Sequence, residues 1–181
     1  MTDTATTTTT WNIDTAHSVL EFSVKHMMFT TAKGRFADFS GTIAFDPQNV
    51  AGSSVEVTID TASITTNTAD RDAHLRSADF FDVESFPQAT FRSTSVEGTG
   101  NELTIHGDLT IKDVTRPVSL KAEFQGTGVN PWGVEVAGFE ATGKFSRKDF
   151  GLNWNQALES GGVLVSDEVK LNLDVQAAKA S

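Results

Sequence analysis

The sequence predicts an all-β domain, an eight-stranded antiparallel barrel with a short helical insert between its third and fourth strands. Three observations predict this fold. About eight stretches of the chain alternate apolar and polar residues with a period of two, which is typical of strands with one buried face. Turn sequences such as DPQN and EGTGN separate these stretches at the spacing of antiparallel hairpins. A single cationic stretch, RDAHLRSADFF, has a helical pattern instead.

The first three strands are expected over residues 18–27, 39–45 and 54–60. Successive side chains on a strand point to opposite faces, so every second residue shares a face. One face of these strands is apolar and the other is polar or small. The inward residues are Leu20, Phe22, Val24 and His26 in the first strand, Phe39, Gly41, Ile43 and Phe45 in the second, and Val55, Val57 and Ile59 in the third.

The helical insert follows the third strand. About 25 residues separate the third and fourth strands, which is too long for a hairpin loop. We expect a short helix from roughly Ala69 to Ala78, because Asn67 or Thr68 can cap its start. Pro87 ends any helical tendency. The helix would lie across one mouth of the barrel or against its wall.

The other five strands are expected over residues 88–96, 101–112, 117–125, 138–146 and 168–176. They alternate in the same way, the first of them more weakly than the rest. Their inward residues are Ala89 and Phe91, then Leu103, Ile105, Leu109 and Ile111, then Val118, Leu120, Ala122 and Phe124, then Phe139, Ala141 and Phe145, and finally Val169, Leu171, Leu173 and Val175.

Closure into a barrel would remove the open edges of such a sheet and cover its apolar face. A sandwich of two sheets is the structural alternative. Glycines within the strands, such as Gly107 and Gly143, favour the strong coiling of a barrel. An eight-stranded barrel either fills with side chains or holds one small ligand. The apolar inward face fits both outcomes, because a core and a pocket for an apolar ligand share one composition.

Composition excludes several classes of protein. The formal net charge is −10, with 14 Lys and Arg against 24 Asp and Glu, which argues against binding to nucleic acid. There is no cysteine, and no apolar run is long enough for a transmembrane segment. Residues 1–10, MTDTATTTTT, are expected to form a disordered tail before a single domain at 11–181. They lack the features of a signal peptide, which predicts a cytoplasmic protein. A homodimer is left open.

The cationic insert has two interpretations. In the structural one, Arg76 pairs with Asp72 four residues earlier, Arg71 bonds a nearby loop, and His74 packs. In the functional one, cations beside an apolar barrel bind the polar head of a lipid through charge-assisted hydrogen bonds. Both interpretations fit the spacing, so they stay open.

The histidines do not form a recognisable metal or catalytic motif. His17, His26, His74 and His106 lack the short spacing of zinc ligands. Ser18 beside His17 would point to the opposite face of a strand, and no Gly-x-Ser-x-Gly sequence occurs. We therefore expect neither a metal site nor a catalytic site. Two alternatives remain, an enzyme that uses His26 or His74 on a small hydrophobic substrate, and an interaction domain with a packed core.

Five sequence pieces in order resemble one known family, the YceI-like proteins, from about Trp11 to Val175. They are WNIDTAHSVLEFSVKHM, GRFADFSGTIAFDP, DAHLRSADFFDVESFPQATF, GDLTIKDVTRPVSL and SRKDFGL. The resemblance implies a lipocalin-like barrel around a long apolar channel, with the helical insert. It also implies that the chain binds an isoprenoid lipid, such as a polyprenyl phosphate or an isoprenoid quinone, as a carrier or buffer and not as an enzyme. No cofactor is expected apart from that lipid.

The resemblance and the alternation together give a set of candidate site residues. In the SRKDFGL loop, Arg147 is expected to pair with Asp149 at a structural corner. The head group of the lipid is expected to meet His26, Arg71, His74 and Arg76. The expected channel lining consists of Phe22, Val24, Phe39, Phe45, Ile59, Phe91, Leu109, Leu120, Phe139 and Leu171.

Overall fold

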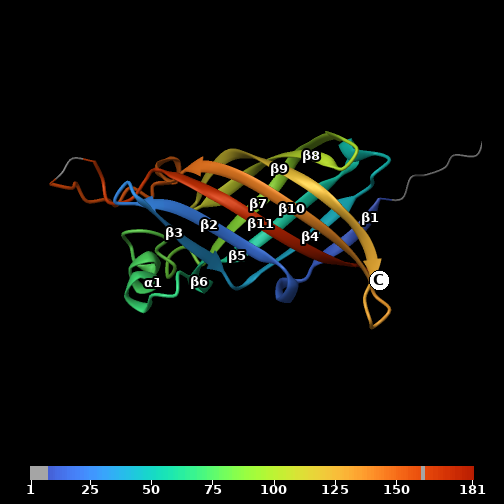
Figure 1. The fold of residues 1–181 in the computed structure, drawn as a ribbon, viewed down its shortest axis with the longest axis horizontal. Coiled ribbons are helices and arrows are strands. Elements are labelled where there is room, and N and C mark those ends of the chain that lie inside the picture. The colour runs from blue at the N-terminus through green and yellow to red at the C-terminus, as the bar shows by residue number, and fades with distance from the viewer. Residues whose placement is uncertain (1–7, 160–161) are drawn as a thin grey trace, which may run out of the picture.

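The computed structural model describes residues 8–159 and 162–181, and these form an elongated barrel (Figure 1). The described chain contains one α-helix, α1 (Ala69–Arg76), and short 3₁₀ turns. Its strands all belong to one antiparallel sheet: β1 (Thr9–Ile13), β2 (Val19–His26), β3 (Thr30–Phe36), β4 (Phe39–Phe45), β5 (Ser54–Asp60), β6 (Ile64–Thr65), β7 (Gln88–Thr99), β8 (Glu102–Ile111), β9 (Val114–Val129), β10 (Glu135–Ser146) and β11 (Glu168–Lys179).

The barrel closes because β1 pairs with both β4 and β11. The closed ring runs β1-β4-β5-β7-β8-β9-β10-β11, which is eight antiparallel strands. At one end, β2 pairs with β11 beyond β1, β3 pairs with β2, and β6 pairs with β3. The pairs β1 and β2, β3 and β4, and β5 and β6 therefore behave as single strands that are interrupted partway. The predicted eight-stranded antiparallel barrel is confirmed.

All eight predicted strands are present, as β2, β4, β5 and β7 to β11, but three further strands are absent from the prediction. Strand β3 has the sequence TTAKGRF, in which no regular apolar alternation exists. It takes the place beside β2, so β4 pairs with β1 and β5 instead. Strand β1 begins at Thr9, so Thr9 and Thr10 of the expected tail lie in the sheet, while residues 1–7 lie outside the described part of the chain.

The helical insert lies between β6 and β7, beside one end of the barrel (Figure 1). Helix α1 ends at Arg76, two residues before the predicted end. The reason is Ser77, whose backbone N–H and hydroxyl both donate to the carbonyl of His74 and close the last turn. Within the described residues, α1 and the other helical segments are too short and too polar to cross a bilayer.

Large inward side chains lie flat over inward glycines on the neighbouring strand. The ring of Phe22 covers Gly34, its partner across β2 and β3, and the ring of Phe91 covers Gly107 of β8. A Cβ at either glycine would collide with the ring that covers it. Each ring therefore occupies the space that a side chain at the glycine would need.

Candidate binding cavity

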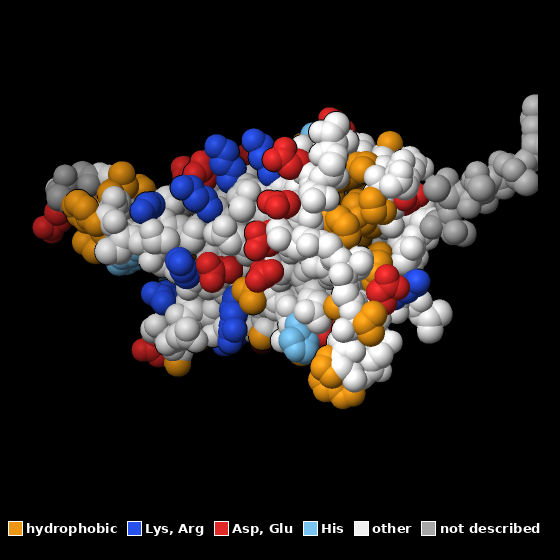
Figure 2. All heavy atoms as spheres, turned by 45° about the vertical axis from the view of Figure 1, so that its right-hand side comes forward, with side chains coloured by type: hydrophobic (Ala, Val, Ile, Leu, Met, Phe, Trp, Pro, Cys, Tyr) orange, Lys and Arg blue, Asp and Glu red, His pale blue; other side chains and the backbone are white. Residues whose placement is uncertain are grey.

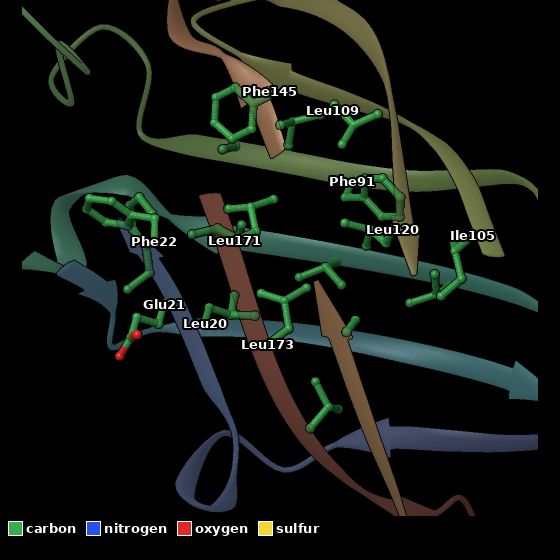
Figure 3. Close-up of a pocket in the computed structure, with 18 of the residues that line it drawn as sticks. Leu20, Glu21, Phe22, Phe91, Ile105, Leu109, Leu120, Phe145, Leu171 and Leu173 are labelled. Carbon is green, nitrogen blue, oxygen red and sulfur yellow. The ribbon is translucent and has the colours of Figure 1, made fainter. Parts of the chain in front are cut away.

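A cavity of about 250 Å³ lies inside the barrel, and all eight strands of the closed ring contribute to its wall. Figure 3 shows leucine, isoleucine and phenylalanine side chains from facing strands that converge on it. Within the described residues, the wall is apolar except at Glu21, Ser53, Ser54 and Arg147. A cavity with such a wall stays dry and binds apolar molecules.

Three phenylalanines, from β4, β9 and β10, pack against one another across one end of the barrel interior. Phe45 and Phe139 line the cavity, and Phe124 packs against both of them. The ring centroids are 4.8 to 5.4 Å apart, in tilted or edge-to-face arrangements that aromatic rings prefer. Trp11 is buried in the same cluster. We call Phe45, Phe124 and Phe139 the aromatic plug.

The opposite end of the cavity is covered by segments that do not belong to the closed ring. The insert contributes Leu75, Phe80 and Phe81, and the loop between β10 and β11 contributes Leu152 and Val165. These residues lie outside the alternating runs, so the sequence analysis missed them. Their signal in the sequence was weak, a few apolar side chains in segments without a strand period.

Nine of the ten predicted channel residues line the cavity, and Phe39 is the exception. Phe39 is buried at the start of β4 but is not part of the wall, although its cross-strand partner Ile59 is. Contact of these side chains with a ligand stays a prediction.

The two arginines of the insert donate to nearby oxygens. Arg76 donates to the backbone carbonyls of Ala62 and Ile64, at 2.9 and 3.0 Å. Arg71 donates through Nε to the Thr66 hydroxyl, at 2.7 Å, and through Nη2 to the Thr66 carbonyl, at 2.9 Å. Both guanidinium groups therefore tie α1 to the segment around β6, and neither lines the cavity.

The two histidines expected at the head group lie outside the cavity wall as well. His26 was expected to face inward, and this was wrong, because the side chain is exposed where β2 runs beyond the closed ring. His74 pairs with Asp79 at 2.9 Å. Its ring also meets Phe80 edge-on, with centroids 5.1 Å apart, and Phe80 lines the cavity.

Arg147 is the one buried cation among the described residues, and 3% of its surface is exposed. It donates to four backbone carbonyls, those of Leu152, Trp154, Val165 and Ser166, at 2.6 to 3.3 Å. Burial lowers the pKa of Arg147, while the negative charge of Asp167, 3.9 Å away, raises it. The structural corner is therefore held by backbone carbonyls and Asp167, and the expected pairing with Asp149 is replaced.

The other serine and histidine side chains considered in the sequence have partners nearby. The Ser18 hydroxyl bonds the backbone of Gln176, and His17 pairs with Asp14 at 2.8 Å. His106 bridges Ser119 and Glu97 on the outer surface. Throughout residues 8–159 and 162–181, no three His, Asp or Glu side chains gather closely enough to hold a metal ion.

Comparison with known proteins identifies relatives over most of the chain. Residues 11–177 match the model of the YceI-like domain. Protein YceI of Escherichia coli O157:H7 is 51% identical over 136 residues, which cover 75% of this chain and 71% of that protein. Protein YceI of Salmonella newport is 50% identical over the same length, with the same coverage.

Several solved structures have the same fold. BcnA of Burkholderia cenocepacia superimposes with a TM-score of 0.80 at 27% identity, over 91% of this chain and 99% of that one. The YceI protein of Campylobacter jejuni has a TM-score of 0.75 at 33% identity, over 87% and 90%. A polyisoprenoid binding domain from Saccharophagus degradans has a TM-score of 0.68 over 94% and 98%, and at 17% identity it shows the fold alone.

Proposed function

Because the chain belongs to the YceI-like family, we propose that it binds a long isoprenoid lipid in the barrel cavity and acts as its carrier or buffer. The lipid class we propose is a polyprenyl phosphate or an isoprenoid quinone. The ligand would enter tail first and extend along the barrel axis.

The cavity itself is the observation that carries this proposal. Empty core volume costs a protein about 24 cal/mol per Å³, so a void of about 250 Å³ costs about 6 kcal/mol relative to a filled core. Domains of this size are stable by only about 5–15 kcal/mol in total. A chain that leaves this volume open sacrifices much of its stability, and a bound apolar molecule would restore it.

The character of the wall favours a long hydrocarbon over a small polar substrate. The apolar side chains offer no hydrogen-bonding partner along most of the cavity. Burial of hydrocarbon is worth about 0.8 kcal/mol per CH₂, so a chain of several isoprene units would bind tightly through its tail alone. The domain from Saccharophagus degradans, which has the same fold, is named for polyisoprenoid binding, and that name supports the choice of ligand class.

We place the head group at the end covered by the insert, because the aromatic plug packs across the other end. His26, Arg71, His74 and Arg76 remain the candidates for head-group contact. Of these, His74 contacts the cavity residue Phe80, so we expect it to contribute most.

The alternative of an enzyme needs a histidine that faces the substrate. Within the described wall of the cavity there is no histidine, and the pair of Ser119 and His106 lies outside this wall, on the outer surface. No observation favours this alternative, so binding without chemistry is the function that we propose.

The test is to extract the purified protein with organic solvent and identify the extracted lipids by mass spectrometry. A lipid-free preparation is then titrated with a polyprenyl phosphate and with an isoprenoid quinone in detergent. We expect an isoprenoid in the extract or saturable binding in the titration. A lipid-free protein that binds neither compound would refute the proposal.

A further inference from the structure

The turn between β2 and β3 carries an unusual pair of residues. The Phe29 N–H donates to the His26 carbonyl, at 3.1 Å, and closes a β-turn over residues 26–29, while His26 pairs with Thr30. Its central residues, Met27 and Met28, have φ of 51° and 68°. Asn-Gly is preferred in such a turn, because a residue with a bulky side chain is strained at positive φ. Met-Met is therefore an unfavourable choice for the backbone.

The same turn also exposes large apolar side chains to solvent, which is unfavourable. Met27 is 42% exposed, Met28 is 60% exposed and Phe29 is 82% exposed. In the neighbouring loop, Val163 is 37% exposed, and Gly162 lies against the side chain of Met28. We call Met27, Met28, Phe29 and Val163 the apolar tip. Backbone strain combined with exposed apolar surface indicates a functional site.

Lysines surround the base of this tip. The hairpin of β2 and β3 carries Lys25 and Lys33, and from residue 22 to residue 37 it contains no acidic residue. Ser23 of β2 pairs with Lys33 on one side and with Lys170 of β11 on the other. Lys170 in turn pairs with Lys144 of β10. Lys33, Lys170 and Lys144 thus form a row on the outer face, which we call the lysine row.

Acidic residues form a second row, farther from the tip. Glu102, Glu123, Glu140 and Asp174 pair in succession across β8, β9, β10 and β11. Figure 2 shows a band of acidic side chains across the middle of this face, with most Lys and Arg on one side of it and apolar side chains at the end beyond, where an acidic side chain also lies. Like charges directly opposite one another destabilise a sheet. The two rows therefore have a cost in stability, and they separate charge along the barrel.

Acids also lie near the tip: Glu21 approaches Lys33 at 3.9 Å, and Glu168 is exposed on β11, nearer the tip than Lys170. In the loop that carries Val163, Asp167 is paired with Lys148 at 3.3 Å. Glu159 is an exposed acid of the same loop. The hairpin itself carries Lys25, Lys33 and Arg35 and has no acid between residues 22 and 37, so the surface nearest the apolar tip is cationic, although the formal net charge of the whole chain is −10.

We propose that the apolar tip inserts into the surface of a lipid bilayer that contains anionic headgroups, and that the lysine row faces those headgroups. Apolar side chains flanked by cations are the combination that binds such an interface. The tip also adjoins the cavity, because Val24 and Val165 line the cavity wall, and Val165 pairs with His26. The purpose of docking, transfer of a lipid between the bilayer and the cavity, rests on the proposed function, but docking itself does not.

The test is sedimentation of the protein with phosphatidylcholine vesicles, with and without phosphatidylglycerol, at low and high salt. We expect at least about tenfold stronger binding to the anionic vesicles at low salt. The informative variant is the triple substitution Met27→Asn, Met28→Gly, Phe29→Thr, which supplies the preferred turn sequence and so preserves the fold. We expect it to lose at least about tenfold in vesicle affinity.

Two variants serve as matched controls. Lys112→Asn with Asp113→Gly changes the turn between β8 and β9, whose two central residues also have positive φ, at 53° and 61°, but are polar. Trp132→Ser removes an 80% exposed apolar side chain from the hairpin of β9 and β10, at the opposite end. Both controls should bind vesicles as the unchanged chain does. Docking at the tip is refuted if the unchanged chain ignores anionic vesicles, if the triple variant still binds them, or if Trp132→Ser abolishes binding.

Uptake of an isoprenoid lipid from detergent micelles separates this inference from the proposed function. We expect the triple variant to take up the lipid from detergent normally but slowly from vesicles. Equal rates from vesicles for both chains would contradict the transfer role. If the unchanged chain takes up no lipid from detergent, the proposed function fails, while vesicle sedimentation still decides whether the tip docks.

Discussion

One oxygen of the Asp72 carboxylate accepts two hydrogen bonds from Thr66, from the backbone N–H at 2.7 Å and from the hydroxyl at 2.5 Å. The same hydroxyl accepts a bond from Arg71, so three residues form one network. Asp72 is 7% exposed, and it holds the segment before α1 against the helix. This insert covers one end of the cavity, so the network positions part of the cavity wall.

Replacement of Asp72 by Asn should reduce stability in a pH-dependent way. Burial raises the pKa of Asp72, but the hydrogen bonds from Thr66 and the charge of Arg76 outweigh burial and hold the pKa below its ordinary value. The contribution of the carboxylate is therefore complete above the unfolded pKa of about 3.9 and disappears as the pH falls through the lower folded pKa. We expect Asp72→Asn to lose about 1–3 kcal/mol at neutral pH.

Urea unfolding of both chains between neutral pH and strongly acidic pH measures this effect. The difference in free energy of unfolding should shrink toward the acidic end, and a difference independent of pH would contradict the assignment. Asp70→Asn is the matched control, an exposed acid in the same helical turn, and should change stability by less than about 1 kcal/mol.

Obstruction of the cavity should abolish lipid binding. Ala141 lines the cavity and packs against both apolar clusters of the barrel interior. The substitution Ala141→Phe would therefore place an aromatic ring inside the cavity. We expect at least about a tenfold loss of affinity for an isoprenoid lipid, because the tail can no longer bury its length. Thr142→Phe, at the next residue and exposed on the outer face, should bind as before, which titration in detergent will show.

The loop between β10 and β11 should depend on Arg147. The substitution Arg147→Met would leave four backbone carbonyls without their hydrogen-bond donor. We expect it to lower the free energy of unfolding by about 2–4 kcal/mol. Lys148→Met removes the exposed neighbour that pairs with Asp167 and should cost less than about 1 kcal/mol. Limited proteolysis should cut the loop faster in the first variant only. Equal stability of the two variants would show that Arg147 does not hold the loop.

The acidic row predicts a stabilising substitution. Glu123 faces Glu140 on one side and Glu102 on the other, so Glu123→Lys would replace two repulsions by two attractions. We expect a gain of about 1 kcal/mol at low salt, which should diminish as salt screens the charges. Glu84→Lys changes the charge equally at an exposed position outside the row, and should not stabilise. A gain of the same size in both variants would mean that net charge alone is responsible.

The alternation of apolar and polar residues predicted those strands in which every second side chain is apolar and faces inward. The eight predicted runs are strands, and nine of the ten predicted channel residues lie on the cavity wall. Strand β3 was missed because its inward residues are Ala32, Gly34 and Phe36, and with a glycine where the ring of Phe22 lies only Phe36 supplies a large apolar side chain. By alternation along β2, His26 belongs to the inward-facing set. Its side chain is nevertheless exposed, because β2 extends beyond the closed ring at this residue.

The environment of the insert was less accessible to sequence reasoning. Arg76 binds the carbonyls of Ala62 and Ile64, which every residue type carries and no pattern reveals. The cover formed by Phe80, Phe81 and Leu152 depends on where two loops fold back, which tertiary packing decides. Spacing along the chain could show that cations and apolar residues are present there, but not which groups they contact.

The two ends of the cavity have different covers, packed rings at one end and folded-back loops at the other. If the proposed lipid stops at Phe45 and Phe139, each additional unit of its tail would have to emerge at the end covered by the insert. The length of the tail would then decide where the polar head lies. Lipids with identical heads but unequal tails would present those heads to different surroundings, and the protein could distinguish them without touching the head at all.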